Sequence, residues 1–217
     1  MTETETARSE VGYVVAEHIA TITLDAPERM NTISATMLDE LSARLLDADR
    51  DRDVRCIVLT GAGRAFCAGL DIALGCDIRV AGESVKLNPG FAKRGILPES
   101  GGTWLLPRMV GYAKAAEIAF TGRTLVAAEA FELGLLNHVV ADGELQARAR
   151  ALAAEIAANA PLAVRAIKRM MRAAETETFE QNVHHVFLQL LPLFRTADFQ
   201  EGVAAYMEKR TPDFTGR

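Results

Sequence analysis

The spacing of hydrophobic positions changes about halfway along the chain. Short runs rich in Val, Ile and Leu come first, at residues 11–15, 19–24, 54–60 and 74–81. Such runs indicate β-strands. The first two are predicted to form a hairpin around residues 16–18, and the last two, being continuously apolar, are typical of buried parallel strands. A helix is predicted between the two pairs, beginning after Ser34, a favourable N-cap, with an apolar stripe over residues 37–46.

From Tyr112 onward the apolar positions follow the period of α-helices. Helices are predicted over residues 114–120, 126–131, 145–158, 162–174 and 179–191, with a short strand over residues 139–141. Pro161 suits a helix start, and Pro192 predicts a break. A strand-rich half followed by a helical half predicts an α/β fold.

Three regions follow from this pattern. Residues 1–10 are polar and acidic and are predicted to form a flexible tail. Residues 11–141 are predicted to form the α/β core, and residues 142–217 a helical C-terminal segment. That segment is rich in Leu, Phe and Met, so it is expected to pack either on a neighbouring subunit or on its own core.

Composition excludes several classes of function. The formal net charge is -5, so the chain lacks the basic surface of a nucleic-acid-binding protein. No apolar run is long enough to span a bilayer, and the N-terminus does not resemble a signal peptide. The three cysteines lack metal-ligand spacing, and their odd number argues against a disulfide framework. A cytoplasmic protein with reduced thiols is therefore predicted.

Two segments carry candidate chemistry. Gly61–Asp71 (GAGRAFCAGLD) is a small-residue loop after a strand, so its backbone N–H groups can approach a ligand and stabilise an oxyanion; a plain structural turn is the alternative. In Pro98-Glu99-Ser100-Gly101-Gly102, a carboxylate stands beside a helix start, where it is either functional or a solvated cap. Ser100 lacks the Gly-x-Ser-x-Gly context of a serine hydrolase.

Histidines give no metal site. His184 and His185 are adjacent, so they point to different sides of a helix and make a poor metal pair.

Five ordered segments resemble the enoyl-CoA hydratase/isomerase (crotonase) family. They are LDAPERMN from Leu24, VLTGAGRAFCAGLDI, GILPESGGTWLLPRMVG, TGRTLVAAEAFELGLLNHVV and the ending DFQEGVAAYMEKRTPDF. The resemblance implies a spiral of ββα units with a helical C-terminal segment, assembled as a homotrimer or a dimer of trimers. It implies an acyl-CoA substrate held between the Pro27 loop and the Ala68 loop, with no metal and no redox cofactor; coenzyme A is part of the substrate.

The resemblance also assigns site residues. The Ala68 N–H matches the position of the first oxyanion-hole donor, and Glu99 matches the position where double-bond isomerases of the family carry their acid/base carboxylate. The expected substrate-binding residues are Glu28, Met30, Ala68, Leu70, Asp71 and Ile72. Where hydratases carry their second glutamate, the chain has Phe91, whose ring cannot transfer a proton. Isomerisation without water addition is therefore favoured.

The chain departs from the family between two of these segments. AFCAGLDI runs directly into ALGCDIRVA, and the two share AGLDIA as if fused. If both flanking runs are strands of one parallel sheet, their connection is too short, because parallel strands need a crossover of a dozen or more residues. A piece of βαβ size, roughly 30 residues or more, is missing. Either it is deleted, or an unobserved segment leaves a chain break within residues 70–75.

Three functions remain open from the sequence. The favoured one is isomerisation of enoyl-CoA double bonds with Glu99 as acid and base. An enoyl-CoA hydratase with its carboxylates in the missing piece is the first alternative. A non-catalytic acyl-CoA-binding subunit is the second, should the fusion be real.

Overall fold

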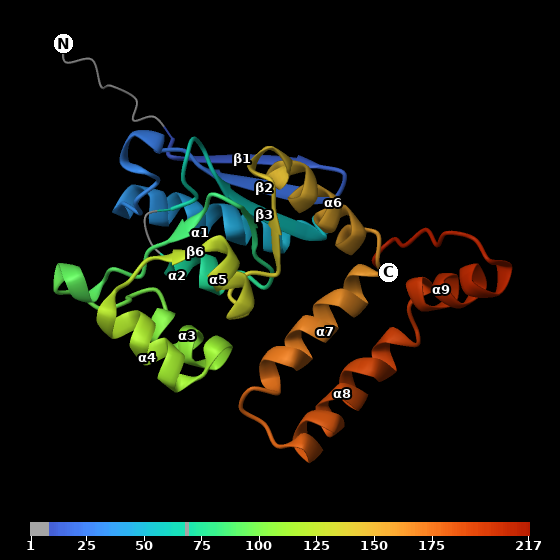
Figure 1. Ribbon diagram of the computed structural model, residues 1–217. Coiled ribbons are helices and arrows are strands. Elements are labelled where there is room, and N and C mark those ends of the chain that lie inside the picture. The colour runs from blue at the N-terminus through green and yellow to red at the C-terminus, as the bar shows by residue number, and fades with distance from the viewer. Residues whose placement is uncertain (1–8, 68–69) are drawn as a thin grey trace, which may run out of the picture. The chain divides into compact units, whose positions relative to one another are not determined.

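The computed structural model describes residues 9–67 and 70–217 (Figure 1). These residues divide into two compact units. The first contains residues 9–14, 21–47 and 58–151, and the second contains residues 15–20, 48–57 and 152–217. All of the predicted site residues belong to the first unit.

A three-stranded sheet contains β1 (Val11–Ala16), β2 (Ile19–Leu24) and β3 (Cys56–Gly61), in that order. Glu17 and His18 join β1 to β2 with φ angles of 52° and 64°, as expected for a tight hairpin turn. The predicted hairpin is confirmed. β3 is only half-buried, so the prediction of a fully buried strand over residues 54–60 was wrong.

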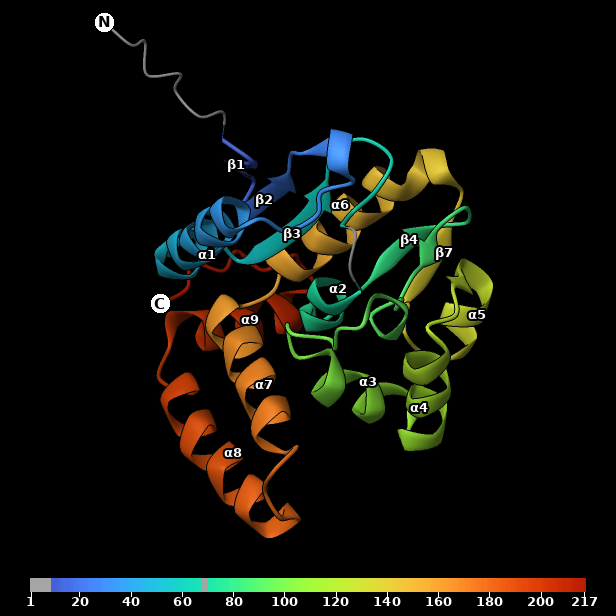
Figure 2. The ribbon, with the colours of Figure 1, turned by 90° about the vertical axis from the view of Figure 1, so that its left-hand side faces the viewer.

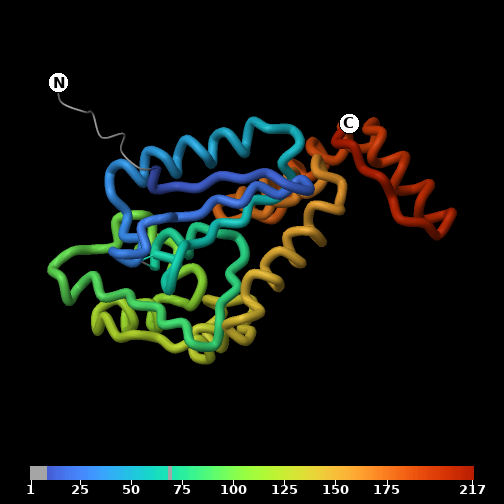
Figure 3. Tube along the Cα trace, turned by 90° about the horizontal axis from the view of Figure 1, so that it is seen from above, coloured from blue at the N-terminus to red at the C-terminus, as the bar shows by residue number. Residues whose placement is uncertain are grey.

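Helix α1 (Ala35–Arg50) packs its apolar stripe on this sheet and runs alongside it in Figure 3. Met37 and Leu41 share an apolar cluster with Ile22 and Leu24 of β2. The predicted cap is confirmed, because the Ser34 hydroxyl accepts a hydrogen bond from the Met37 N–H at 3.0 Å.

The rest of the first unit surrounds a second apolar cluster. The 3-10 turn η1 (Pro27–Arg29) connects β2 to α1. After β3, the first unit contains, in chain order, α2 (Asp71–Gly75), β4 (Val80–Gly82), β5 (Lys86–Leu87), η2 (Ala92–Arg94), α3 (Gly102–Val110), α4 (Tyr112–Thr121), β6 (Leu125–Val126), α5 (Ala127–Glu132), β7 (His138–Val140), η3 (Asp142–Glu144) and the first part of α6 (Leu145–Ala157). β4 pairs with β7 in parallel, and β5 pairs with β6 antiparallel. Figure 2 shows β4 beside β7, with α2, α3 and α4 near them. The cluster draws on α2, α3, α4 and α5 through Leu74, Leu106, Ile118 and Ala130.

The junction at residues 70–75 is helical and continuous. The Leu74 N–H bonds to the Leu70 carbonyl at 3.1 Å, and both side chains are buried. The predicted chain break is therefore wrong, and so is the predicted strand over residues 74–81, which begins only at Val80. Leu70 and Leu74 are four residues apart, which is the spacing of one helix face.

The second unit is mainly helical. After α6 it contains α7 (Pro161–Ala173), α8 (Phe179–Leu193) and α9 (Ala197–Glu208), and α7 and α8 lie side by side in Figures 1 and 2. The predicted break at Pro192 was wrong by one residue, because α8 continues to Leu193. The C-terminal residues fold back on α9, where the buried Asp198 carboxylate accepts the N–H groups of Thr215 and Gly216 at 2.7 and 2.9 Å.

Two smaller findings concern the predicted tail and membranes. Residues 1–8 lie outside the described residues, whereas the Glu10 N–H at the end of the predicted tail bonds to the Glu40 carboxylate at 2.8 Å. Within the described parts of the chain, no helix combines the length and the apolar character needed to cross a membrane.

Candidate functional site

Asn31 ties together the two loops that were predicted to hold the substrate. Its side chain is fully buried, and its φ of 53° is in the left-handed region that Asn tolerates better than most residues. Oδ1 accepts the Ala26 N–H at 2.8 Å, within its own loop. Nδ2 donates to the carbonyls of Ala62 and Ala65, at 3.0 and 2.7 Å, in the Gly61–Asp71 loop. One side chain therefore fixes the spacing of the two loops.

Gly63 makes a second contact between the same loops. Its φ is 75°, and a Cβ atom there would lie 2.8 Å from Cβ of Pro27. Only glycine therefore allows this approach. The neighbouring Glu28 and Met30, both predicted to bind substrate, have exposed side chains on this turn.

The predicted oxyanion donor Ala68 lies outside the described residues. The structure places its neighbours on both sides: Cys67 is half-buried and belongs to the same apolar cluster as α1 and β2. Leu70, on the other side, is buried at the start of the α2 segment.

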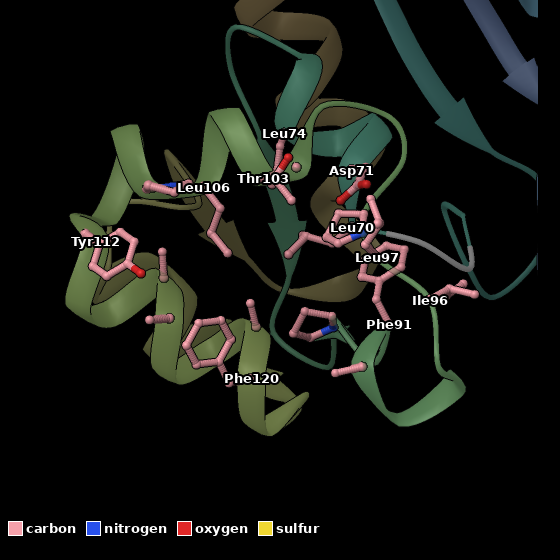
Figure 4. Close-up of a pocket in the computed structure, with 18 residues that line it drawn as sticks. Leu70, Asp71, Leu74, Phe91, Ile96, Leu97, Thr103, Leu106, Tyr112 and Phe120 are labelled. Carbon is pink, nitrogen blue, oxygen red and sulfur yellow. The ribbon is translucent and has the colours of Figure 1, made fainter.

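An apolar cavity of about 350 Å³ begins beside Leu70 (Figure 4). Its walls come from α2, from residues 89–98, and from α3 and α4. Phe91 is buried and lines the cavity, so the residue that replaces the hydratase glutamate contributes an apolar wall. Leu70 and Asp71 line it as well, whereas the half-buried Ile72 does not belong to the lining residues.

Asp71 is the one acidic side chain among the described residues that line the cavity. It is 5% exposed, and its Oδ2 accepts the Ser100 N–H at 3.3 Å. A backbone hydrogen bond from Gly102 also reaches this carboxylate. Burial raises the pKa of Asp71 above its ordinary value, and the charge of Glu99 raises it too, against the effect of the two hydrogen bonds.

Glu99 has an exposed side chain and is not one of the lining residues of the cavity. The charge of Glu99 nevertheless raises the pKa of two residues, Cys67 and Asp71. Burial raises the pKa of the Cys67 thiol, and Glu99 raises it as well. Glu99 directly precedes Ser100, whose N–H is bonded to Asp71 at 3.3 Å, so the backbone at Glu99 lies close to the Asp71 carboxylate.

Sequence reasoning missed the roles of two residues. Asn31 was only the last letter of a matching segment, and Asp71 was only one of several expected substrate contacts. An Asn that follows a turn and tolerates a left-handed backbone is a usable sequence signal for Asn31. Asp71 offers no comparable signal, because its partners lie 29 residues further on.

No group of three or more His, Cys, Asp or Glu side chains suited to a metal ion occurs among residues 9–67 and 70–217. Cys56, Cys67 and Cys76 form no disulfide bond, and all three are half-buried.

An α/β core that sets two bonded loops, an apolar cavity and carboxylates side by side suits an enzyme that binds an apolar acyl group. Comparison with known proteins gives the family. The model of the enoyl-CoA hydratase/isomerase family matches residues 15–75 and 70–217, and the chain belongs to this family. An acyl-CoA substrate is implied by the family.

Curated relatives match almost the whole chain. The 1,2-epoxyphenylacetyl-CoA isomerase of Escherichia coli is 33% identical over 256 aligned positions, which cover 94% of this chain and 97% of the relative. The enoyl-CoA hydratase EchA19 of Mycobacterium tuberculosis is 34% identical over 252 positions, with 92% and 94% covered.

A solved structure confirms the fold. The crystal structure of an enoyl-CoA hydratase from Mycobacterium tuberculosis superposes with a TM-score of 0.93 at 29% identity, covering 97% of this chain and 100% of that chain. The predicted α/β crotonase fold with C-terminal helices is therefore correct.

The comparisons also locate the shortened segment. Both curated alignments are longer than the 217 residues of this chain, so the relatives contain residues with no counterpart here. The two family matches overlap at residues 70–75, which stand at the junction of two family segments. These residues form a continuous helical segment, which connects the two family segments directly.

Proposed function

We propose that this chain is an isomerase of enoyl-CoA thioesters in which Glu99 moves a proton between two carbons of the acyl chain. One observation carries the proposal: Glu99 stands between Pro98, which lines the apolar cavity, and Ser100, whose N–H is bonded to the cavity residue Asp71 at 3.3 Å. A carboxylate near the oxyanion loop is suitably located to act on the carbons next to a thioester carbonyl.

In this mechanism the thioester oxygen accepts a hydrogen bond from the Ala68 N–H. Glu99 removes a proton from the α-carbon of a 3-enoyl-CoA, and the electron pair moves through the thioester to give an enolate. The enolate then re-forms the carbonyl as the γ-carbon takes the proton back from Glu99, which leaves the double bond between the α- and β-carbons. No water is consumed, and Glu99 ends as it began.

The apolar cavity is suited to the acyl chain. Leu70 and Asp71 line it next to the oxyanion loop, and Phe91 closes one side without offering a group to activate water. Glu28 and Met30, exposed on the loop that Asn31 holds, and Ile72 are proposed to contact other parts of the substrate. Glu99 is exposed in the free chain, so the bound thioester would itself cover it and exclude water.

Hydration of 2-enoyl-CoA is the second candidate. The observation that favours it is the presence of a second carboxylate, Asp71, beside Glu99. Against it, the Asp71 carboxylate already accepts backbone N–H groups from Ser100 and Gly102, which reduces its capacity to bind a water molecule. A non-catalytic acyl-CoA-binding subunit is the third candidate, because one family segment runs directly into the next at residues 70–75.

Product analysis distinguishes the three candidates. The full chain is incubated separately with 3-enoyl- and 2-enoyl-CoA panels in water enriched in oxygen-18; products are separated by chromatography and identified by the ultraviolet absorbance of the conjugated 2-enoyl thioester and by mass spectrometry. Isomerisation predicts a 2-enoyl product of unchanged mass. A heavier, 18O-labelled hydroxyacyl product would show hydration instead, and binding without any product would show the non-catalytic role.

We also propose that the second unit contributes to a homotrimer or a dimer of trimers. Phe187 and Leu191 on α8 and Val203 and Tyr206 on α9 are at least half exposed, and exposed large apolar side chains in such number are typical of an interaction surface. Light scattering after size-exclusion chromatography should give a mass of three or six chains. A monomeric mass at micromolar concentration would contradict this assembly.

A further inference from the structure

The N-terminus of α3 receives its cap from another segment of the chain. Gly101, with a φ of 91°, precedes the helix and has no side chain to bond the first N–H groups. Such groups need an acceptor, because they have no partner within the helix. Asp71, 31 residues before Gly102, accepts a backbone hydrogen bond from this first helical residue, and it also accepts the N–H of Ser100 in the preceding turn.

The packing at the start of α3 leaves no room for a side chain at position 102. A Cβ atom on Gly102 would lie 2.7 Å from Cγ of Asp71 and 2.9 Å from Cβ of Pro98. The carboxylate, the backbone of the turn and the proline ring are therefore in direct contact. Pro98 and Ser100 are the two chain neighbours of Glu99, so the Ser100–Asp71 hydrogen bond and the packing of Gly102 against Pro98 together fix the backbone on both sides of Glu99.

The location of Asp71 depends on the shortened segment. Asp71 is the first residue of α2, and α2 begins where the two family segments overlap. Leu70 and Leu74 bury the same face of this short helix in the core cluster, which fixes the direction of the Asp71 side chain. A buried carboxylate is stable there because backbone N–H groups compensate for its lost hydration.

We propose that Asp71 is a positioning residue for Glu99: its buried carboxylate holds the turn Pro98–Gly102 and thereby sets the Glu99 side chain against the substrate. This inference rests on the proposed function of Glu99. It assigns to Asp71 no proton transfer of its own. Its effect on catalysis passes through Glu99.

The test compares kcat and the dissociation constant of an acyl-CoA for Asp71→Ala, Asp71→Asn, Glu99→Gln and the double variant Asp71→Ala/Glu99→Gln. Asp71→Ala should lower kcat about 100-fold, since a displacement of about 1 Å at a catalytic group has effects of that size. Acyl-CoA affinity should fall much less than kcat, because Asp71 is only one of the residues that line the cavity. Asp71→Asn keeps one oxygen acceptor and should retain at least about tenfold more activity than Asp71→Ala.

The double variant separates positioning from direct catalysis. In the Glu99→Gln background, Asp71→Ala should cause no further loss, because a residue that acts through Glu99 has nothing left to position. A further loss of the same size as in the single variant would overturn the proposal, and so would equal losses in Asp71→Asn and Asp71→Ala. A Glu99→Gln variant with normal kcat would contradict the proposed function as well as the positioning role.

A second readout does not depend on turnover. Amide hydrogen exchange at Ser100 and Gly102 should be faster in Asp71→Ala, because each N–H loses its acceptor. Asp142→Ala is the matched control, since the Asp142 carboxylate also accepts a backbone N–H, that of Ser84 at 3.1 Å, in another loop. Asp142→Ala should leave kcat and exchange at Ser100 unchanged. Normal activity with unchanged exchange in Asp71→Ala, while Glu99→Gln is inactive, would refute the positioning role and leave the proposed function intact.

Discussion

Asn31→Ala should loosen the contact between the two substrate loops and lower the stability of the protein. The side chain makes three hydrogen bonds, at 2.7 to 3.0 Å, to Ala26, Ala62 and Ala65, one of them buried and two partly buried. Each contributes about 1 kcal/mol net, and alanine tolerates the φ of 53° less well than asparagine. The free energy of unfolding should therefore fall by about 3 to 4 kcal/mol.

Urea denaturation of the variant and the wild type measures this difference. Asn159→Ala is the matched control, because the Asn159 side chain makes a single exposed hydrogen bond, to the Glu155 carbonyl at 2.7 Å. It should change stability by no more than about 0.5 kcal/mol. The KM of Asn31→Ala for an acyl-CoA should also rise, since the loops that hold the substrate are no longer joined. If Asn31→Ala unfolds within about 1 kcal/mol of Asn159→Ala, the loops are held by other contacts.

Three further predictions concern acid stability, the buried carboxylate and the cavity. Hydrogen bonds from Arg210 lower the pKa of Glu201 from 4.5 to about 2, so the stabilisation that Glu201 gives the fold is present above pH 4.5 and lost as the pH falls toward 2. Glu201→Gln should therefore flatten the plot of unfolding free energy against pH in this range, and an unchanged plot would contradict this. Burial raises the pKa of Asp71, so the wild type should lose stability relative to Asp71→Asn as the pH rises above 3.8; a stability difference between the two that is independent of pH would exclude this. Ala119 lines the cavity, and Ala119→Trp should raise KM for long acyl chains about tenfold or more while short chains are unaffected, because each excluded methylene is worth about 0.8 kcal/mol; equal KM changes for both chain lengths would mean that acyl groups bind elsewhere.

Local patterns predicted the parts of the fold that depend on neighbours in sequence. The hairpin, the Ser34 cap and the helices from α4 to α8 follow from periodicity and capping residues, and the structure has them within a few residues of the expected bounds. The strand expected over residues 74–81 failed for a physical reason. Its first residues continue a short helix whose buried face is Leu70 and Leu74, and tertiary packing outweighs the apolar run that follows.

The site could be predicted only in outline. Matching segments indicated Glu99 and the loop around Ala68, but the role of Asn31 depends on carbonyl groups more than 30 residues away. The same holds for Asp71, whose partners belong to a different turn. Such contacts follow from the folded chain and leave no periodic trace in the sequence.

Glu99→Gln tests the central claim most directly. The change keeps the size of the side chain and removes the base, so turnover of a 3-enoyl-CoA should fall about 100-fold or more. Calorimetric affinity for a saturated acyl-CoA should stay within about 2-fold of wild type, because we propose that the oxyanion loop and the cavity hold the thioester and the acyl chain. Wild-type turnover in Glu99→Gln would contradict the assignment of Glu99 as the acid and base.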